Sequence, residues 1–185
     1  MNNDIIISSQ ENILLMSLKK FYNMNKEARI IIDIINGTSK ISIRLINFLI
    51  TNYSKKNNLI YKINNNNFNI YSNYKSQLKS YNKKYFDPFS RGNRIPFFFK
   101  FKNDEDCLIT TIGQLNFFRW VLENKILDYI EKHYDDINKD MNKRNSTTKN
   151  RKEKGKQTRK TREELSVSAS KSIKREEVEI IVSFK

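Results

Sequence analysis

The sequence is poor in the residues from which metal sites, disulfides and catalytic loops are built. Its 185 residues include one cysteine, Cys107, and one histidine, His133. A disulfide within the chain is therefore impossible, and a zinc site is nearly so, because such a site needs three or four cysteine or histidine ligands. Only four glycines and two prolines are present, which leaves few positions for the tight turns of catalytic loops.

Several other signals are also missing. The sequence contains no glycine-rich phosphate loop, no His-Glu-x-x-His helix and no Gly-x-Ser-x-Gly turn. No window reaches about 18 uninterrupted apolar residues, so we expect no transmembrane helix. The first residues, Met1 to Asp4, lack the basic region of a signal peptide, so we expect an intracellular protein in a reducing compartment. We expect no enzymatic activity, no cofactor, no catalytic residue and no metal site.

Positive charge is abundant and unevenly distributed. Lysine and arginine number 35 against 20 acidic residues, which gives a formal net charge of +15. Residues 142–162 carry ten basic side chains, one acidic side chain and no apolar residue. Such a composition cannot form a core, so we expect this basic stretch to be disordered. A charge of this sign predicts an acidic partner, and we favour nucleic acid.

The basic stretch has three interpretations. It neutralises phosphates of DNA or RNA without sequence specificity, it is a nuclear localisation signal, or it is a solvated linker. We favour the first, because ten charges occur without any apolar residue. No apolar face accompanies them, so we do not expect the stretch to bind a membrane. The predicted phosphate-contacting side chains of the stretch are Lys143, Arg144, Lys149, Arg151, Lys152, Lys154, Lys156, Arg159, Lys160 and Arg162.

Hydrophobic periodicity predicts a mainly helical folded domain over residues 1–141. Capping boxes that begin at Ser8 and Thr111, and a helix-ending glycine at position 37, mark the ends of helices. Alternating apolar and polar residues on both sides of an asparagine run predict a β-hairpin near 59–71. The predicted helices cover about 8–22, 26–36, 39–53, 72–85 and 111–130, and a further strand covers 95–101.

The predicted fold class is α+β, mainly helical. It combines a small helical domain with a β-hairpin over 1–141, the basic disordered stretch 142–162, and a C-terminal segment 163–185. In this last segment, apolar residues at every second position from Val178 to Phe184 predict a strand.

A group of cations follows from the predicted helix 72–85. Its members are Lys75, Lys79, Lys83, Lys84, Arg91 and Arg94. The first three are spaced four residues apart and form one stripe on a helix, which we call the lysine ridge. Tyrosines occupy the neighbouring face and could stack on bases while the lysines contact phosphates. The alternative is an ordinary amphipathic helix with solvated lysines and with tyrosines in the core.

Three helices followed by a hairpin are also the order of a winged-helix DNA-binding unit. In that interpretation, residues 39–53 form the recognition helix and residues 64–67 the tip of the wing. The side chains of this helix that could reach bases are Lys40, Arg44, Asn47 and Asn52. Because the rest of the helix is largely apolar, we favour a plain helical bundle with a hairpin.

Four blocks of sequence resemble a known family. They are SIRLINFLITNYSKKN at 42–57, YKSQLKSYNKKYFDPFSRGNRIPF at 74–97, TTIGQLNFFRWVLENKILDYI at 110–130, and ELSVSASKSI with EVEIIVSF between 164 and 184. The chain resembles an uncharacterised protein family of nucleocytoplasmic giant DNA viruses, in the mimivirus-like and algal-virus groups. The resemblance implies a viral protein in the host cytoplasm and supplies no catalytic or binding residues.

Charge and resemblance together predict a non-enzymatic viral nucleic-acid-binding protein that contacts phosphates through the basic stretch and the lysine ridge. We expect DNA rather than RNA as the nucleic-acid partner. The alternative is a scaffold or assembly protein of the viral factory, which self-associates and condenses with nucleic acid. Further expected partners are a second copy of the chain and other viral proteins, but not a membrane. The expected location is the viral factory in the host cytoplasm or the virion interior, with the nucleus as an alternative.

Overall fold

The computed structural model describes residues 8–25, 27–100 and 105–154. The chain divides into two units, residues 1–146 and residues 147–185. Of the second unit, the structure describes a helical backbone as far as Lys154. The described part of the first unit is mainly helical and carries two antiparallel β-hairpins, which confirms the predicted fold class, α+β and mainly helical.

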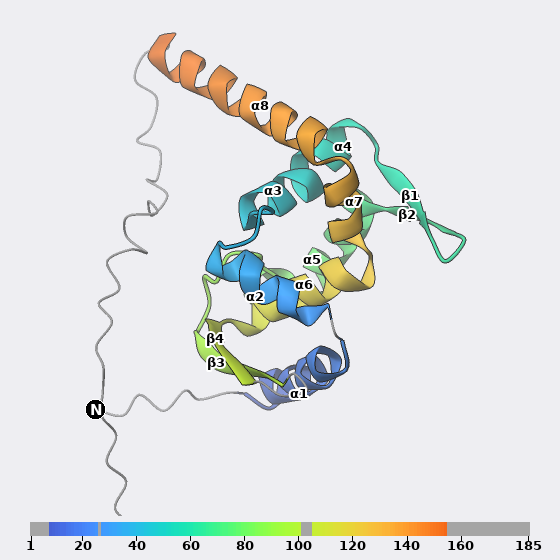
Figure 1. The fold of residues 1–185 in the computed structure, drawn as a ribbon, viewed down its shortest axis with the longest axis vertical. Helices are drawn as coiled ribbons and strands as arrows, with labels where there is room; N and C mark the ends of the chain where they lie inside the picture. Colours follow the sequence, from blue (N-terminus) through green and yellow to red (C-terminus); the bar gives the residue numbers. More distant parts are fainter. Residues whose placement is uncertain (1–7, 26, 101–104, 155–185) are drawn as a thin grey trace, which may run out of the picture. The chain divides into compact units, whose positions relative to one another are not determined.

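Figure 1 shows these elements in order along the chain. The helices are α1 (Ser9–Met24), α2 (Ala28–Asn36), α3 (Ile43–Phe48), the π-helical turn η1 (Leu49–Tyr53), α4 (Ser54–Lys56), α5 (Ile70–Tyr85), α6 (Ile112–Glu123), α7 (Ile126–Lys132) and α8 (Tyr134–Lys154). The strands are β1 (Ile60–Ile63), β2 (Asn66–Asn69), β3 (Ile95–Lys100) and β4 (Glu105–Thr110).

The predicted start of the first helix and the predicted end of the second helix are confirmed. The Ser8 hydroxyl accepts a hydrogen bond from the Glu11 backbone N–H at 3.3 Å, and the Glu11 carboxylate accepts one from the Ser8 N–H at 2.9 Å. Gly37 ends α2 with a φ of 77°. The buried face of α1 packs against α6 and β3, where the Tyr22 hydroxyl donates to the Leu115 carbonyl at 2.6 Å.

The third helix begins at Ile43 rather than near residue 39, because the Ser42 hydroxyl accepts a hydrogen bond from the Leu45 N–H and caps the helix there. It continues through η1 and α4. Leu45, Ile46 and Leu49 are buried, Lys40 precedes the helix, and Asn47 and Asn52 are half-buried. The side chains assigned to a recognition helix therefore do not share one exposed helical face.

The predicted hairpin 59–71 is confirmed as β1 and β2, with Tyr61 paired to Phe68. Asn64 and Asn65 form its two-residue turn with φ values of 47° and 66°, as a tight hairpin turn of this length requires. The hairpin projects from the helices (Figure 1) but is fixed at its base, where the Tyr61 hydroxyl donates to the Asn124 carbonyl at 2.6 Å.

The predicted strand 95–101 is present as β3, and it pairs with a second strand, β4, that was not predicted. The first residues of β4, Glu105 and Asp106, are acidic and atypical of strands. The sequence of β4 therefore lacks the alternation of apolar and polar residues that predicts a strand. One face of this hairpin buries Phe97, Phe99 and Leu108, and β3 packs against α1 through contacts of Phe97 and Phe99 with Tyr22.

The core is centred on α6, in which every residue from Ile112 to Phe118 is buried. The predicted helix 111–130 is in fact two helices, because Lys125 adopts the left-handed conformation with a φ of 50° between α6 and α7. The Asn124 side chain donates to the Trp120 carbonyl and closes α6 at this point. The predicted apolar stripe nevertheless lies in the core, including Leu115, Phe118 and Ile126.

The prediction of disorder over the basic stretch 142–162 is wrong for residues 142–154, which continue α8. Lysine, arginine and glutamate favour the helical state, and adding residues to an existing helix costs less than starting one. Tyr134 to Met141, with Ile137 buried, provide that start. Residues 155–162 and the predicted strand in segment 163–185 lie outside the described residues.

Candidate nucleic-acid interface

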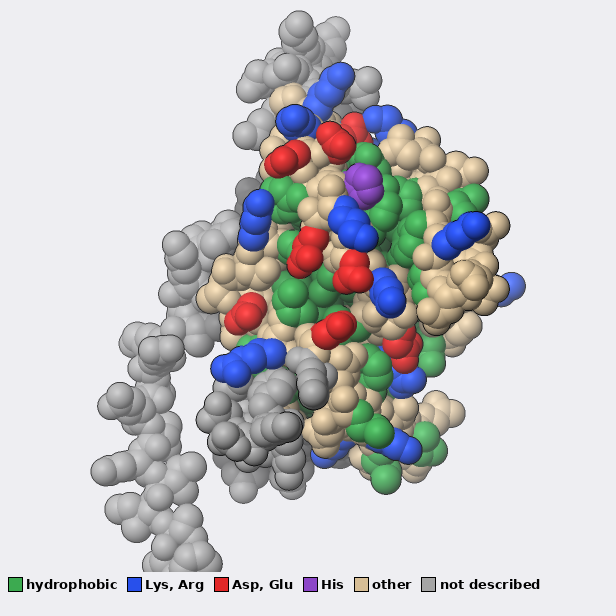
Figure 2. Space-filling view, turned by 45° about the vertical axis from the view of Figure 1, so that its right-hand side comes forward, with side chains coloured by type: hydrophobic (Ala, Val, Ile, Leu, Met, Phe, Trp, Pro, Cys, Tyr) green, Lys and Arg blue, Asp and Glu red, His purple; other side chains and the backbone are tan. Residues whose placement is uncertain are grey.

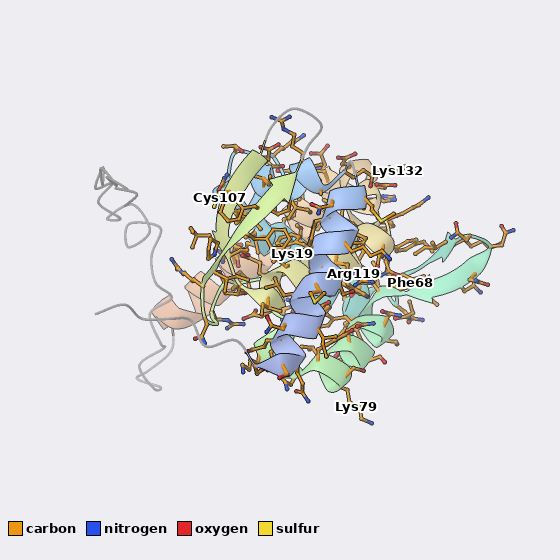
Figure 3. All side chains as sticks on the ribbon, turned by 90° about the horizontal axis from the view of Figure 1, so that it is seen from below. Lys19, Phe68, Lys79, Cys107, Arg119 and Lys132 are labelled. Atoms are coloured by element: carbon orange, nitrogen blue, oxygen red, sulfur yellow. The ribbon has the colours of Figure 1, made fainter. Side chains whose placement is uncertain are left out.

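The lysine ridge is only partly regular in the structure. Lys75 and Lys79 are exposed on α5, and Figure 3 shows Lys79 projecting away from the helices. Lys83 is also exposed, but Asn82 before it has non-helical angles, with φ 52° and ψ −179°, so the helix is kinked there. The prediction of one straight stripe is therefore wrong at Lys83, although the three lysines remain on one segment.

Two of the neighbouring cations are paired with carboxylates. Lys84 forms an ion pair with Glu11 at 3.0 Å, which joins the end of α5 to the start of α1. Arg91 donates two hydrogen bonds to Asp87, at 2.6 and 2.8 Å, and holds the turn after α5. Both side chains therefore have structural partners. All three cations are exposed, and among the described residues no carboxylate forms an ion pair with Arg94.

The hydrogen bonds at Glu11 have an electrostatic consequence. The backbone N–H of Ser8 and the ammonium of Lys84 stabilise the ionised carboxylate, which lowers the pKa of Glu11 from 4.5 to about 2. The contact between α1 and α5 therefore stays charged in all but strongly acidic solution.

The tyrosines beside the ridge divide between core and surface. Tyr74 is buried and packs against Phe86 and Trp120, with ring centroids 6.0 and 6.1 Å away. Burial raises the pKa of its phenol, which therefore remains neutral. Tyr71 is half-buried and stands at the edge of the core, while Tyr81 is exposed. Among these rings, Tyr71 is the one that has two lysine ammonium groups near its ring, those of Lys55 and Lys75.

Cations from three segments converge on one pocket, which we call the basic pocket. It has a volume of about 410 Å³. Its lining residues are Thr51, Asn52, Lys55, Lys56, Tyr71, Tyr74, Lys75 and Arg144. The structure thus brings together Lys75 and Arg144, two predicted phosphate contacts that are far apart in the sequence.

The charges of the basic pocket are arranged around Tyr71. The ammonium groups of Lys55 and Lys75 each lie 5.6 Å from the centre of the Tyr71 ring. Lys56 is paired with Asp140 of α8 at 2.6 Å. Within the described part of the chain, no carboxylate forms an ion pair with Lys55 or Lys75. The pocket therefore has a surplus of positive charge, which favours an anion.

Side-chain hydrogen bonds to the backbone hold η1 in the conformation in which it lines this pocket. The Thr51 hydroxyl donates to the Asn47 carbonyl at 2.7 Å, and the Ser54 hydroxyl donates to the Ile50 carbonyl at 2.5 Å. Such bonds supplement the backbone ladder where the helix is widened, and π-helical turns are frequent at functional sites. The turn presents Thr51 and Asn52 to the pocket and is followed directly by Lys55 and Lys56.

Sequence reasoning did not predict Lys55 or Lys56 as contacts. They form only a pair of adjacent lysines, without the charge run or helical spacing that marked the other cations. Of the predicted basic stretch, Lys143 and Arg144 are exposed on α8. Lys149, Arg151, Lys152 and Lys154 lie on its described backbone, and Lys156, Arg159, Lys160 and Arg162 lie outside the described residues.

Metal ligation and membrane spanning were also expected to be absent. Among them, no group of three or more histidine, cysteine, aspartate or glutamate side chains is placed to hold a metal ion. None of the helices in this part of the chain combines the length and the apolar character needed to cross a bilayer. Cys107 is exposed on β4.

Fold and pocket together define a mainly helical α+β protein with a basic pocket of about 410 Å³. A family model described as "Family of unknown function (DUF7197)" matches residues 1–185, and the chain belongs to this family. "Uncharacterized protein L507" of Acanthamoeba polyphaga mimivirus is 42% identical over 143 residues, which cover 74% of this chain and 54% of that protein. The chain thus spans about half the length of this relative, and the resemblance to a giant-virus family is confirmed. No solved structure matches.

Proposed function

We propose that this protein is a non-enzymatic viral nucleic-acid-binding protein that contacts phosphates with its basic pocket, the exposed lysines of α5 and the basic stretch. The observation that carries the proposal is the basic pocket, in which cations of α4, α5 and α8 line one cavity. Among the described residues, Lys55 and Lys75 have no ion-paired carboxylate, so their charges repel each other, and a phosphate relieves that repulsion.

On another face of the first unit, charge is mixed. Figure 2 shows acidic and basic side chains interspersed around the histidine, on the face formed by α7 and the start of α8. Asp128, Glu131, Asp135 and Asp136 are exposed there. A phosphate backbone would meet carboxylates on that face, so the attraction is concentrated on the side of the basic pocket and α5.

The salt dependence of binding tests this function. Each cation that neutralises a phosphate contributes about 0.7 to the slope of log K against log salt on single strands and about 0.9 on duplex DNA. Replacing Lys75 and Lys79 by glutamine in the full chain should therefore make the slope shallower by about 1.4 or 1.8 respectively. Fluorescence anisotropy of a labelled oligonucleotide and its duplex, titrated at several salt concentrations, measures both slopes.

The matched control replaces Lys19 and Lys132 by glutamine. Both are exposed, on α1 and α7, and Figure 3 shows that they lie apart from Lys79. This variant loses the same net charge, so it should retain the wild-type slope if contacts are localised. Equal slopes in the two variants would remove α5 from the interface, and a full chain that binds neither strand form at low salt would refute the proposed function.

The scaffold function is the second candidate, and exposed apolar side chains favour it. Ile13 and Met16 on α1 are each 70% exposed, and Phe98 and Ile109 on the outer face of β3 and β4 are 51% and 57% exposed. Such side chains favour contact with another protein surface. In the same titrations, binding that begins only at concentrations where light scattering detects self-association would favour the scaffold.

A further inference from the structure

We propose that the basic pocket receives one nucleotide of a single strand, with its phosphate on Lys55 and Lys75 and its base against Tyr71. This inference rests on the proposed function and specifies the substrate class, because a nucleotide can enter a pocket only when its base is outside a duplex stack. Single-stranded DNA or RNA, or a strand end, is therefore the expected ligand.

The size of the basic pocket supports a nucleotide rather than a phosphate alone. Its volume of about 410 Å³ falls in the range of small-molecule sites, roughly 300–1,000 Å³, and far exceeds that of one phosphate group. A duplex presents phosphates and sugars on a convex surface and keeps its bases inside. Such a surface could approach the rim of the pocket but could not fill it.

The cations are placed for one phosphate. Lys55 comes from α4 and Lys75 from α5, and both ammonium groups approach the same ring at 5.6 Å from its centre. Attraction between an ammonium and a ring is weaker than a charge-assisted hydrogen bond to a phosphate oxygen. Both lysines have long, flexible stems, so they can leave the ring for a phosphate and uncover the ring for a base.

The wall beside the cations is suited to a base. Tyr71 lies in the first turn of α5, and Tyr74, one turn further, is anchored in the core against Trp120. Aromatic side chains of this kind provide stacking platforms for unpaired bases, and they do so for every base type. The ring is half-buried, so it is held in place while part of its surface remains accessible.

Asn52 adds a polar group to the wall of the basic pocket. Its side-chain N–H donates to the Thr51 hydroxyl at 2.9 Å. No described residue donates a hydrogen bond to the side-chain oxygen of Asn52, which is therefore available to accept one from a base N–H. A phosphodiester of the strand carries no O–H group and could not use such an acceptor, whereas a base N–H could.

Two measurements on the full chain test the inference. The first compares a 12-nucleotide single strand with the matching duplex for wild type, Tyr71→Leu and Tyr71→Phe. Loss of one stacked base should weaken single-strand binding by about 5- to 140-fold in Tyr71→Leu. Tyr71→Phe keeps the ring and should keep the affinity, and duplex binding should remain within about twofold in both variants. Equal losses on single strand and duplex in Tyr71→Leu would overturn the inference.

The second measurement needs no variant, so it remains decisive if Tyr71→Leu does not fold. Thymidine 5′-monophosphate, inorganic phosphate and thymidine compete with the labelled single strand bound to the wild-type protein. The monophosphate should compete at a lower concentration than either of the others. Equal competition by inorganic phosphate and the monophosphate would show a simple anion site and would overturn the inference. The proposed function would still stand in that case, because it requires only salt-dependent binding.

Discussion

A methyl group added at Gly113 should destabilise the protein, although the same change stabilises most helices. Gly113 lies in the first turn of α6, where replacing glycine by alanine ordinarily gains about 1 kcal/mol. Here the new Cβ would lie 2.7 Å from the Lys84 carbonyl oxygen and 3.4 Å from the Phe86 backbone nitrogen. These atoms belong to the backbone at the end of α5, and Gly113 also accepts a hydrogen bond from the Asp87 N–H.

Whether Gly113→Ala stabilises or destabilises the protein depends on two opposing free energies, the cost of overpacking and the gain in helix propensity. Overpacking against backbone costs about 1–3 kcal/mol, and the absence of a flexible neighbour places the cost in the upper half of that range. After the gain in helix propensity, Gly113→Ala should lower the free energy of unfolding by about 1–2 kcal/mol, or the melting temperature by roughly 2–8 °C. Thermal unfolding followed by circular dichroism measures the change.

Two other glycines provide matched controls. An alanine at Gly92 would touch only Thr111, at an ordinary 3.9 Å, so it should raise the free energy of unfolding by about 0.4–1 kcal/mol. Gly37 has open space but a φ of +77°, so alanine there should cost about 1–2 kcal/mol through backbone strain alone. If Gly113→Ala proved as stabilising as Gly92→Ala, the close approach of α6 to the end of α5 would be wrong.

Two further predictions concern the same body. Glu11→Gln should lower the melting temperature at neutral pH, and the difference from wild type should persist above pH 4.5 and vanish as the pH falls towards 2, because the folded-state pKa lies below the usual value. A difference that did not change with pH would contradict the ionised contact with Ser8 and Lys84. Leu122→Ala should cost about 2–5 kcal/mol in unfolding free energy, because this side chain is only 8% exposed. Unchanged thermal stability would mark the α6 stripe as a partner surface and favour the scaffold function.

Features of the fold that depend on neighbouring residues could be predicted from the sequence. The capping box of Ser8 and Glu11, the left-handed Gly37 and the asparagine turn of the first hairpin each require only a few adjacent residues. The burial of Leu115 and Phe118 could be predicted because a continuous apolar stripe on a helix faces the core.

Features that depend on distant contacts could not be predicted. The break at Lys125 interrupts a continuous helical pattern, and the carbonyl before it is held by Tyr61 from the hairpin. Strand β4 is paired along β3 although its first residues are acidic. The helical state of residues 142–154 depends on a start provided by the preceding packed turns of α8. In each case, tertiary structure outweighs the local preference.

The candidate site follows the same division. The cations of α5 were predicted because helical spacing places Lys75 and Lys79 on one side of one element. Their meeting with Lys55 and Arg144 depends on how α4, α5 and α8 pack, for which no local pattern exists. The signal that the sequence offered for Lys55 and Lys56 was a pair of adjacent lysines shortly after Thr51 and Asn52. This pair lies within 42–57, one of the blocks that resemble the family. The ion pair between Lys56 and Asp140 joins α4 to α8, so one cation of the basic pocket already has a carboxylate partner. The charge left for a phosphate is therefore centred on Lys55 and Lys75, each with its ammonium group 5.6 Å from the centre of the ring on which a base would stack.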